Sequence, residues 1–231
     1  MREIYTLKKY NVNFSGVIHI GAHRGEEIEY YENEFNAKNV IFVEPNPEVF
    51  DELKFNIHNK SFYNIKSFCY CCAISDFNGT ADFNLIYGQD ANFMSGNKGC
   101  SSLLEIDYKN VADCNNNHHF IFKNKIKVSV KTLDCLLEEH DHNFSDFQFL
   151  NIDAQGVELK VLNGAQKLLN NKNLKYILIE STVDKPFYKE NSTFAEIKNF
   201  LETKNFKFLE MIWHNVNVWG DALFVRNENE N

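Results

Sequence analysis

The sequence predicts an α/β fold, a mostly parallel sheet with helices on both faces. Short apolar runs alternate with helical patterns along most of the chain, as they do in successive βαβ units. The last two apolar runs, residues 206–212 and 219–225, are joined by too few residues for a helical crossover, so they predict an antiparallel hairpin. With 231 residues, of which 44% are hydrophobic, the chain is expected to form one domain over residues 1–231.

The individual elements are read from apolar runs and helix signals. Strands are expected at 17–20, 40–44, 68–75, 125–130, 147–153 and 176–181, ahead of the hairpin, and helices at about 26–35, 48–58, 132–139, 156–169 and 194–204. Residues 77–125 have hairpin character at Asn78-Gly79 and then become polar and irregular. Because long irregular segments in compact domains are commonly functional, we expect this one on the substrate side. The core is expected over about 15–226, with 227–231 as a frayed tail.

Composition excludes several classes of function. The net charge is −8 and no Lys/Arg cluster lies beside stacked aromatic residues, which argues against a nucleic-acid partner. No apolar run approaches the ~18 residues of a transmembrane segment, so a cytoplasmic protein is expected. Three of the six cysteines crowd one predicted strand, as expected of reduced thiols rather than of a zinc or disulfide framework. Oligomeric state is left open.

The turn after the first strand is the first candidate site. Gly21 and Gly25 would let the backbone pass close to a ligand at the start of a helix, although the same spacing also suits a plain tight turn. Glu44 ends the second strand, where an acid can accept both hydroxyls of a ribose. Glu26 and Glu27 would repel a pyrophosphate but suit a cation. This charge pattern favours S-adenosylmethionine (SAM), which carries a sulfonium on an adenosine, over a dinucleotide.

Two further observations argue against a dinucleotide enzyme. A dinucleotide-binding sheet normally reaches its sixth strand through a helix, whereas this chain ends in a hairpin. A short-chain dehydrogenase would also need Tyr-x-x-x-Lys beyond its middle strands, and the only such spacing, Tyr5 to Lys9, precedes the first strand.

The chain resembles the FkbM-type SAM-dependent methyltransferases over roughly residues 17–226. The resemblance is carried, in order, by "VIHIGAHRGEE", "IFVEPNPEVFDELKFN", "CCAISDFNGTADF", "SSLLE", "VKTLDCLLEE", "FLNIDAQGVELKVLNGA", "ILIES" and "WGDALFVR". It implies a seven-stranded, Rossmann-like class I methyltransferase fold and methyl transfer from SAM to an oxygen. Members act on hydroxyls of sugars or polyketide-type products, so the acceptor is expected to be a sugar in a bacterial surface glycan or its precursor. A small natural product, an amine, or an inactive SAM-fold binding module remain alternatives.

The resemblance also implies roles for residues near the cofactor. The methionine part of SAM would lie against the first turn, and Glu44 would hold the ribose. Asp76 would approach the adenine amino group, unless it is an ordinary turn residue before Asn78-Gly79. Family members commonly carry an acid where this chain has His19, so the contact at that point differs. The expected cofactor-binding residues are His19, Gly21, Ala22, Gly25, Glu44, Asp76 and Asp153.

Asp153 and Glu158 are the expected catalytic residues, at the end of the fourth core strand and in the first turn of the next helix. Asp153 would take the proton of the acceptor hydroxyl or orient that hydroxyl, or a divalent metal such as Mg²⁺ or Mn²⁺ would bridge both acids and the sugar. Helix capping would explain either acid alone. Weaker candidates are Ser101, Ser102 and Glu180 for acceptor or cofactor contacts, and His118 or His119 as the base if one of them covers the acceptor.

Overall fold

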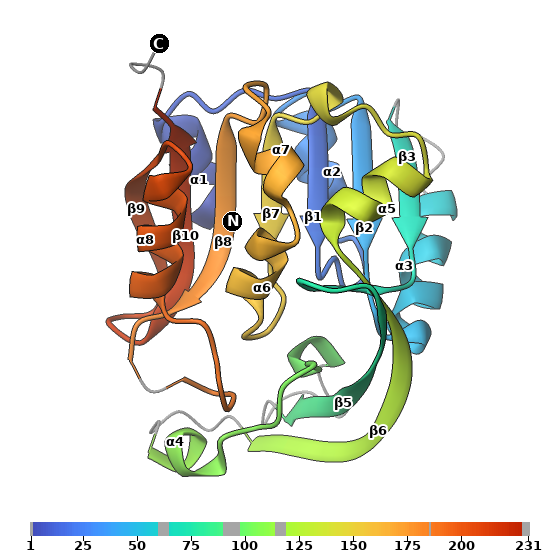
Figure 1. Cartoon of the computed structure of the whole chain (residues 1–231), viewed down its shortest axis with the longest axis vertical. Helices are drawn as coiled ribbons and strands as arrows, with labels where there is room; N and C mark the ends of the chain where they lie inside the picture. The colour runs from blue at the N-terminus through green and yellow to red at the C-terminus, as the bar shows by residue number, and fades with distance from the viewer. Residues whose placement is uncertain (1, 60–64, 90–97, 114–118, 185, 228–231) are drawn as a thin grey trace.

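The computed structural model describes residues 2–59, 65–89, 98–113, 119–184 and 186–227 (Figure 1). Its main sheet has the strand order β3-β2-β1-β7-β8-β10-β9. The strands are β1 (Gly16–Ile20), β2 (Asn39–Val43), β3 (Lys66–Tyr70), β7 (Phe149–Ile152), β8 (Tyr176–Thr182), β9 (Phe206–Asn215) and β10 (Trp219–Arg226). Pairing is parallel except that β10 runs antiparallel to both β8 and β9. The predicted mostly parallel sheet with a closing antiparallel hairpin is therefore confirmed.

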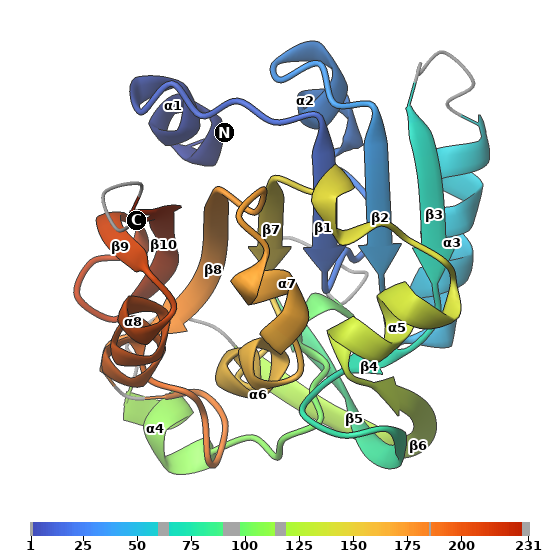
Figure 2. The same ribbon diagram turned by 45° about the horizontal axis from the view of Figure 1, so that its top comes forward.

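Helices cover both faces of the main sheet (Figure 2). On one face lie α1 (Arg2–Lys9), α2 (Ile28–Asn33) and α3 (Pro47–Asn59), and on the other α5 (Leu133–Glu139), α6 (Glu158–Asn163), α7 (Gln166–Asn170) and α8 (Phe194–Thr203). Alternation along β1 builds both cores, because Val17 packs into the cluster of α1 to α3 while Ile18 and Ile20 pack into the other. A strand buried on both faces accounts for the unbroken apolar run in the sequence.

A second sheet lies at the carboxyl ends of the main parallel strands (Figure 1). It consists of β4 (Ala73–Ile74), β5 (Gly79–Gln89) and β6 (His119–Lys131), with β5 and β6 antiparallel. The prediction of an irregular segment at 77–125 is therefore wrong for β5 and for the start of β6. The predicted strand 68–75 also divides, because β3 ends at Tyr70 and the next two paired residues join the second sheet.

Two helices also differ from the sequence-based prediction. The helix expected at 156–169 is divided into α6 and α7 at Gly164, where an added Cβ would lie 2.1 Å from the carbonyl oxygen of Ser75. The close approach of that backbone explains the break. The helix α1 was not predicted, and it buries Leu7 in the core while Lys9 pairs with Glu210 of β9 at 2.6 Å.

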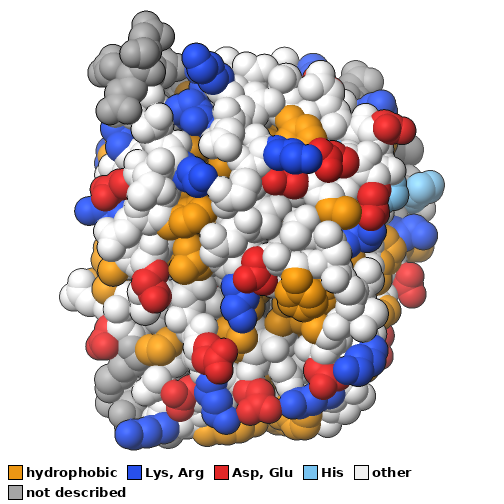
Figure 3. Space-filling view, in the orientation of Figure 1, with side chains coloured by type: hydrophobic (Ala, Val, Ile, Leu, Met, Phe, Trp, Pro, Cys, Tyr) orange, Lys and Arg blue, Asp and Glu red, His pale blue; other side chains and the backbone are white. Residues whose placement is uncertain are grey.

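The remaining short elements are α4 (Tyr108–Asp113) and single 3₁₀ turns at Lys98–Cys100 and Phe144–Asp146. Among the described residues, no helix has the length and apolar character that a membrane span requires. On the face drawn in Figure 3, basic and acidic side chains are interspersed rather than gathered in one patch. Ion pairs among the described residues include Lys131 with Glu139 and Lys167 with Glu138.

Candidate active site at the carboxyl ends of the parallel strands

A cavity of about 560 Å³ lies where β1, β2, β7 and β8 end. Its other walls come from β4, from the 98–103 segment, and from Phe187 and Trp219. Ligands of doubly wound sheets bind at this edge, because the strand order reverses there and leaves a crevice between the first βα turns. The volume falls within the range of about 300–1,000 Å³ that small-molecule sites occupy.

The first turn is shaped by two glycines with different roles. Gly21 lines the cavity at a φ of +76°, and a Cβ there would lie 1.7 Å from the carbonyl oxygen of Asp153. Glycine is therefore needed for β1 and β7 to close together, and Ala22 follows on the cavity wall. Gly25, at φ +70°, is not a lining residue, and its Cβ would lie 2.6 Å from Leu53 of α3. The structure thus gives Gly25 a packing role instead of the expected ligand contact.

His19 lies on the cavity wall but is almost entirely buried. Its Nε2 is 3.2 Å from Nδ2 of Asn151, and its Nδ1 is 3.2 Å from the hydroxyl of Tyr31. An Nε2 that accepts from the Asn151 amide leaves the ring hydrogen on Nδ1, facing Tyr31. Burial lowers the pKa of His19 to about 4, so the ring is neutral at neutral pH. A neutral ring does not supply the negative charge of the acid that the family resemblance leads one to expect at this position.

Glu44 is buried on the cavity wall at the end of β2. Its carboxyl oxygens accept hydrogen bonds from the backbone N–H groups of Asn46, at 2.8 Å, and His23, at 3.1 Å. Burial raises its pKa to about 7. The two N–H donors fix the carboxyl at the predicted ribose position, on the side of the cavity formed by β1 and β2.

His23 was missed by the sequence analysis. It lines the cavity, and its Nδ1 is 3.0 Å from the carboxyl of Glu26. Although burial lowers the pKa of His23, the hydrogen bond with Glu26 raises it overall. Among the described residues no group pairs with its buried Nε2. A buried polar atom without a partner on a cavity wall is expected where a ligand completes the site.

Asp153 follows β7 and lines the cavity together with Gln155 and Glu180. The Nε2 of Gln155 donates to Asp153 Oδ1 at 2.5 Å and to Glu180 Oε2 at 2.9 Å, while Tyr188 donates to Gln155 Oε1 at 2.7 Å. Burial raises the pKa of both acids, and the negative charge of Asp153 raises that of Glu180 further. The pKa of Glu180 is thus held well above its usual value beside Asp153, whose own pKa is raised by burial and lowered in part by the hydrogen bond from Gln155.

The structure does not bring Glu158 to this cavity. It is buried in the first turn of α6, where Oε1 accepts from the backbone N–H groups of Ala154, at 3.2 Å, and Gly156, at 2.9 Å. Burial raises its pKa to about 7. Glu158 thus holds the turn that follows β7, which supports Asp153 without contacting the cavity. A shared metal with Asp153 gains no support from this arrangement.

The two candidate serines are structural partners of the cavity wall. Ser101 lines the cavity, and its Oγ accepts from the backbone N–H of Ile86 at 3.1 Å. Ser102 is buried outside the lining, donates to the carbonyl of Gln155 at 2.6 Å and accepts from the N–H of Leu104 at 2.9 Å. The 98–104 segment is thereby fastened to the turn that carries Asp153.

Asp76 is exposed and lies outside the cavity lining, where it accepts a hydrogen bond from the Ser75 hydroxyl at 3.2 Å. The structure thus does not bring it to the expected adenine contact, and the wall there is formed by residues 72–74. His118 lies outside the described residues, and His119 begins β6.

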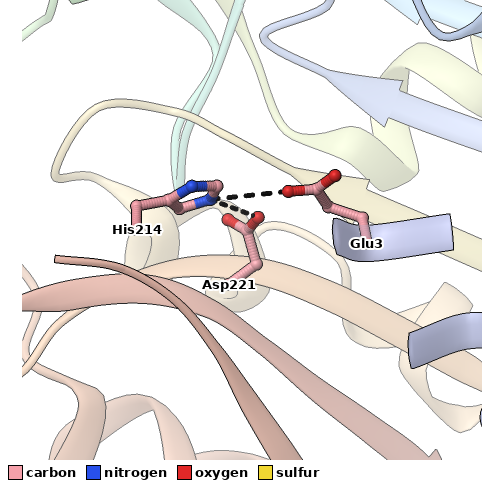
Figure 4. Close-up of side chains that lie close together, drawn as sticks. All are labelled: Glu3, His214 and Asp221. Atoms are coloured by element: carbon pink, nitrogen blue, oxygen red, sulfur yellow. Dashed lines mark hydrogen bonds and ion pairs between the residues drawn. The ribbon is translucent and has the colours of Figure 1, made fainter. Parts of the chain in front are cut away.

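One group of possible metal ligands occurs within the described parts of the chain: Glu3, His214 and Asp221 (Figure 4). His214 Nε2 is 2.7 Å from Asp221 Oδ2 and 3.8 Å from Glu3 Oε1. The hydrogen bond with Asp221 raises the pKa of His214. These distances describe a histidine paired with two carboxyl groups at the rim of the sheet, outside the cavity lining.

The residues present fit SAM. An apolar wall formed by Val43 and residues 72–74 can hold an adenine ring beside Glu44, whose carboxyl suits a ribose diol. Glu26 on the first turn supplies negative charge for the sulfonium and ammonium groups, and its neighbour Glu27 lines the same cavity with a pKa that burial raises to about 7. His23 Nε2 offers a buried polar atom that no described residue satisfies.

Comparison with known proteins agrees with this description. The FkbM methyltransferase domain matches residues 19–208. A structure of methyltransferase FkbM from Methylobacillus flagellatus is similar with a TM-score of 0.59 and 12% identity, covering 92% of this chain and 43% of that one. The chain therefore spans less than half the length of that protein. No curated protein matches the chain.

Two further structures share the fold. A Streptococcus pneumoniae protein, named as a candidate tRNA (m1A22) methyltransferase, has a TM-score of 0.53 and 7% identity, over 100% of this chain and 72% of that one. An uncharacterised Listeria monocytogenes protein has a TM-score of 0.52 and 7% identity, over 100% and 70%. With a class I methyltransferase fold and a domain match over most of its length, the chain belongs to the FkbM methyltransferase family.

Proposed function

We propose that the protein transfers a methyl group from SAM to a hydroxyl of a sugar, in a surface glycan or its precursor. The family supplies the methyltransferase class. The cavity supplies the reason for a hydroxyl acceptor, because a buried carboxylate there can take the proton that an alcohol must lose.

The position of Asp153 is the observation that carries the proposal. Its backbone closes directly onto the cofactor turn, since its N–H donates to the carbonyl of Ile20 at 2.9 Å and its own carbonyl abuts Gly21. Its carboxylate lines the same cavity as Glu44 on one side and as Phe187 and Trp219 on the other. A base at this point lies between the cofactor half and the remaining half, where an acceptor oxygen has to approach.

Each group of residues has a separate role in the proposed reaction. Bound SAM would supply an electrophilic methyl group. Glu44 and the acids of the first turn hold and orient the cofactor, while Gln155 fixes the Asp153 carboxylate by a hydrogen bond. Burial raises the pKa of Asp153, and a raised pKa makes a carboxylate a stronger base than that of an exposed aspartate.

The experiment is a methyl-transfer assay with radiolabelled SAM and a panel of methyl glycosides, nucleotide sugars, small phenols and amines. Wild-type protein is expected to label a sugar. Asp153→Asn, which keeps shape but removes the base, is expected to lower kcat about 10²- to 10⁴-fold while S-adenosylhomocysteine (SAH) binds within about threefold of wild type. Labelling of amines or phenols alone would contradict the sugar acceptor, and an unchanged kcat in the variant would contradict the role of Asp153.

A further inference from the structure

The cavity has an aromatic wall on the side away from Glu44 and His23. Trp219, the first residue of β10, and Phe187, in the connection after β8, both line the cavity. Their rings meet edge to face, with centroids 6.2 Å apart and an angle of 79°. The cofactor contacts described above use neither ring, so this wall is left to a second ligand.

The indole of Trp219 is supported from behind. The ring of His214 stacks on it with centroids 4.6 Å apart and an angle of 29°. His214 is held in turn by Asp221 at 2.7 Å, with Glu3 beyond it at 3.8 Å (Figure 4). The cluster therefore joins α1, β9 and β10 behind one aromatic ring, and it fixes the angle at which that ring enters the cavity.

Carboxyl groups lie beside the aromatic wall. Asp221 pairs with Glu180 across β10 and β8, and Trp219 pairs with Thr182 in the same ladder, so the indole stands next to the Glu180 strand end. Glu180 and Asp153 both line the cavity and share the amide of Gln155. An aromatic surface beside carboxyl oxygens matches a sugar, which has an apolar C–H face and a rim of hydroxyl donors.

We propose that Trp219 is the platform on which the acceptor sugar ring stacks, with the ring's hydroxyls directed toward Asp153 and Glu180, and that His214 is a positioning residue behind the platform. This inference rests on the proposed function, since it assigns that function's acceptor to one part of the cavity. It predicts that Trp219 determines the affinity for the sugar, whereas the affinity for the cofactor depends on the opposite wall, which carries Glu44 and His23.

Intrinsic fluorescence can test the platform directly, because the chain has two tryptophans and Trp213→Phe leaves Trp219 as the only one. The Trp213→Phe protein, saturated with SAH, is titrated with methyl glucoside, methyl galactoside, methyl mannoside and their disaccharides. Sorbitol, which has hydroxyls but no ring, is the control. At least one glycoside is expected to change the Trp219 emission saturably, whereas sorbitol is expected to leave it unchanged.

Calorimetry on variants separates the platform from the cofactor site. Trp219→Ala is expected to weaken glycoside binding at least tenfold while the Kd for SAH moves less than twofold, with Trp219→Phe as an intermediate if the alanine variant folds poorly. His214→Ala is expected to weaken glycoside binding about threefold or more, and His214→Phe, which retains a ring against the indole, to restore it. A purely structural role for His214 would affect SAH and glycoside binding alike.

Three results would overturn the inference: no glycoside binds the SAH complex, glycosides bind without changing Trp219 emission, or Trp219→Ala binds them as tightly as wild type. Failure of the wild-type protein to bind SAH is a separate outcome, because it would contradict the proposed function and not the platform alone.

Discussion

Replacing Gly21 by alanine should destabilise the protein more than any other glycine-to-alanine change at the first turn. Two costs combine. The positive φ of +76° costs about 1–2 kcal/mol for an L-residue. The new Cβ would also lie 1.7 Å from the Asp153 carbonyl oxygen, so the ends of β1 and β7 must separate by more than an ångström. That separation weakens the bond from Asp153 N to Ile20 O, about 1 kcal/mol, and disturbs a packed edge, about 1–3 kcal/mol.

The expected loss for Gly21→Ala is therefore about 3–6 kcal/mol, or a Tm lower by about 6–24 °C for a chain of this size. Gly79→Ala is the matched control. Gly79 also has a positive φ, +153°, but its added Cβ would meet only the Phe77 ring at 3.9 Å, an ordinary contact. It should lose about 1–2 kcal/mol from backbone strain alone. Urea unfolding followed by circular dichroism measures both variants, and losses equal within 0.5 kcal/mol would refute the steric argument.

Three further predictions concern residues around the cavity. Burial raises the pKa of Glu158 in the folded state from 4.5 to about 7. The protonated side chain therefore adds to the folding stability below pH 4.5, and this added stability is lost as the pH rises through 7. The stability of wild type relative to Glu158→Gln should thus fall by about 3 kcal/mol between pH 4.5 and 8 in denaturant titrations, and a constant difference would contradict this. Ser102→Ala should cost about 1–3 kcal/mol by leaving the Leu104 N–H without its acceptor, with Ser15→Ala as an exposed control. Asp76→Ala should change the Kd for SAH less than twofold, and a tenfold loss would restore the adenine contact expected from sequence.

The sequence contained enough information for the main sheet. Apolar runs of four to six residues mark strands that are buried on both faces, and the short link between residues 212 and 219 permits only a hairpin. The break between α6 and α7 at Gly164 could not be predicted from the sequence, because it depends on the backbone of Ser75, which is far away in the chain. The second sheet was missed for a similar reason: Phe83 and Leu85 pack only once β6 lies beside them.

For the candidate site too, some features could be predicted from the sequence and others depend on tertiary contacts. Strand ends converge at one edge of a parallel sheet, so Glu44, Asp153 and Gly21 could be expected in one cavity, and all three line it. Side-chain direction within the following turn is not fixed by spacing. Glu158 therefore faces the backbone N–H groups of its own turn, and Gly25 faces α3.

Several cavity residues had no clear signal in the sequence. His23 lies within the glycine turn and could have been flagged as a polar residue between Gly21 and Gly25. Gln155 and Trp219 enter the site only through tertiary contacts, the first through its bonds to Asp153 and Glu180 and the second through the pairing of β10 with β8.

The most direct test of the central claim is isothermal titration of the purified protein with SAH, beside Glu44→Ala. A cofactor held by the first turn and by Glu44 predicts micromolar binding to wild type and at least a tenfold loss in the variant, because the buried carboxyl held by His23 and Asn46 would no longer meet the ribose. Absence of binding to the wild-type protein would contradict the methyl-transfer account of this cavity. Equal binding by both proteins would show that SAH occupies a different place from the one assigned to it.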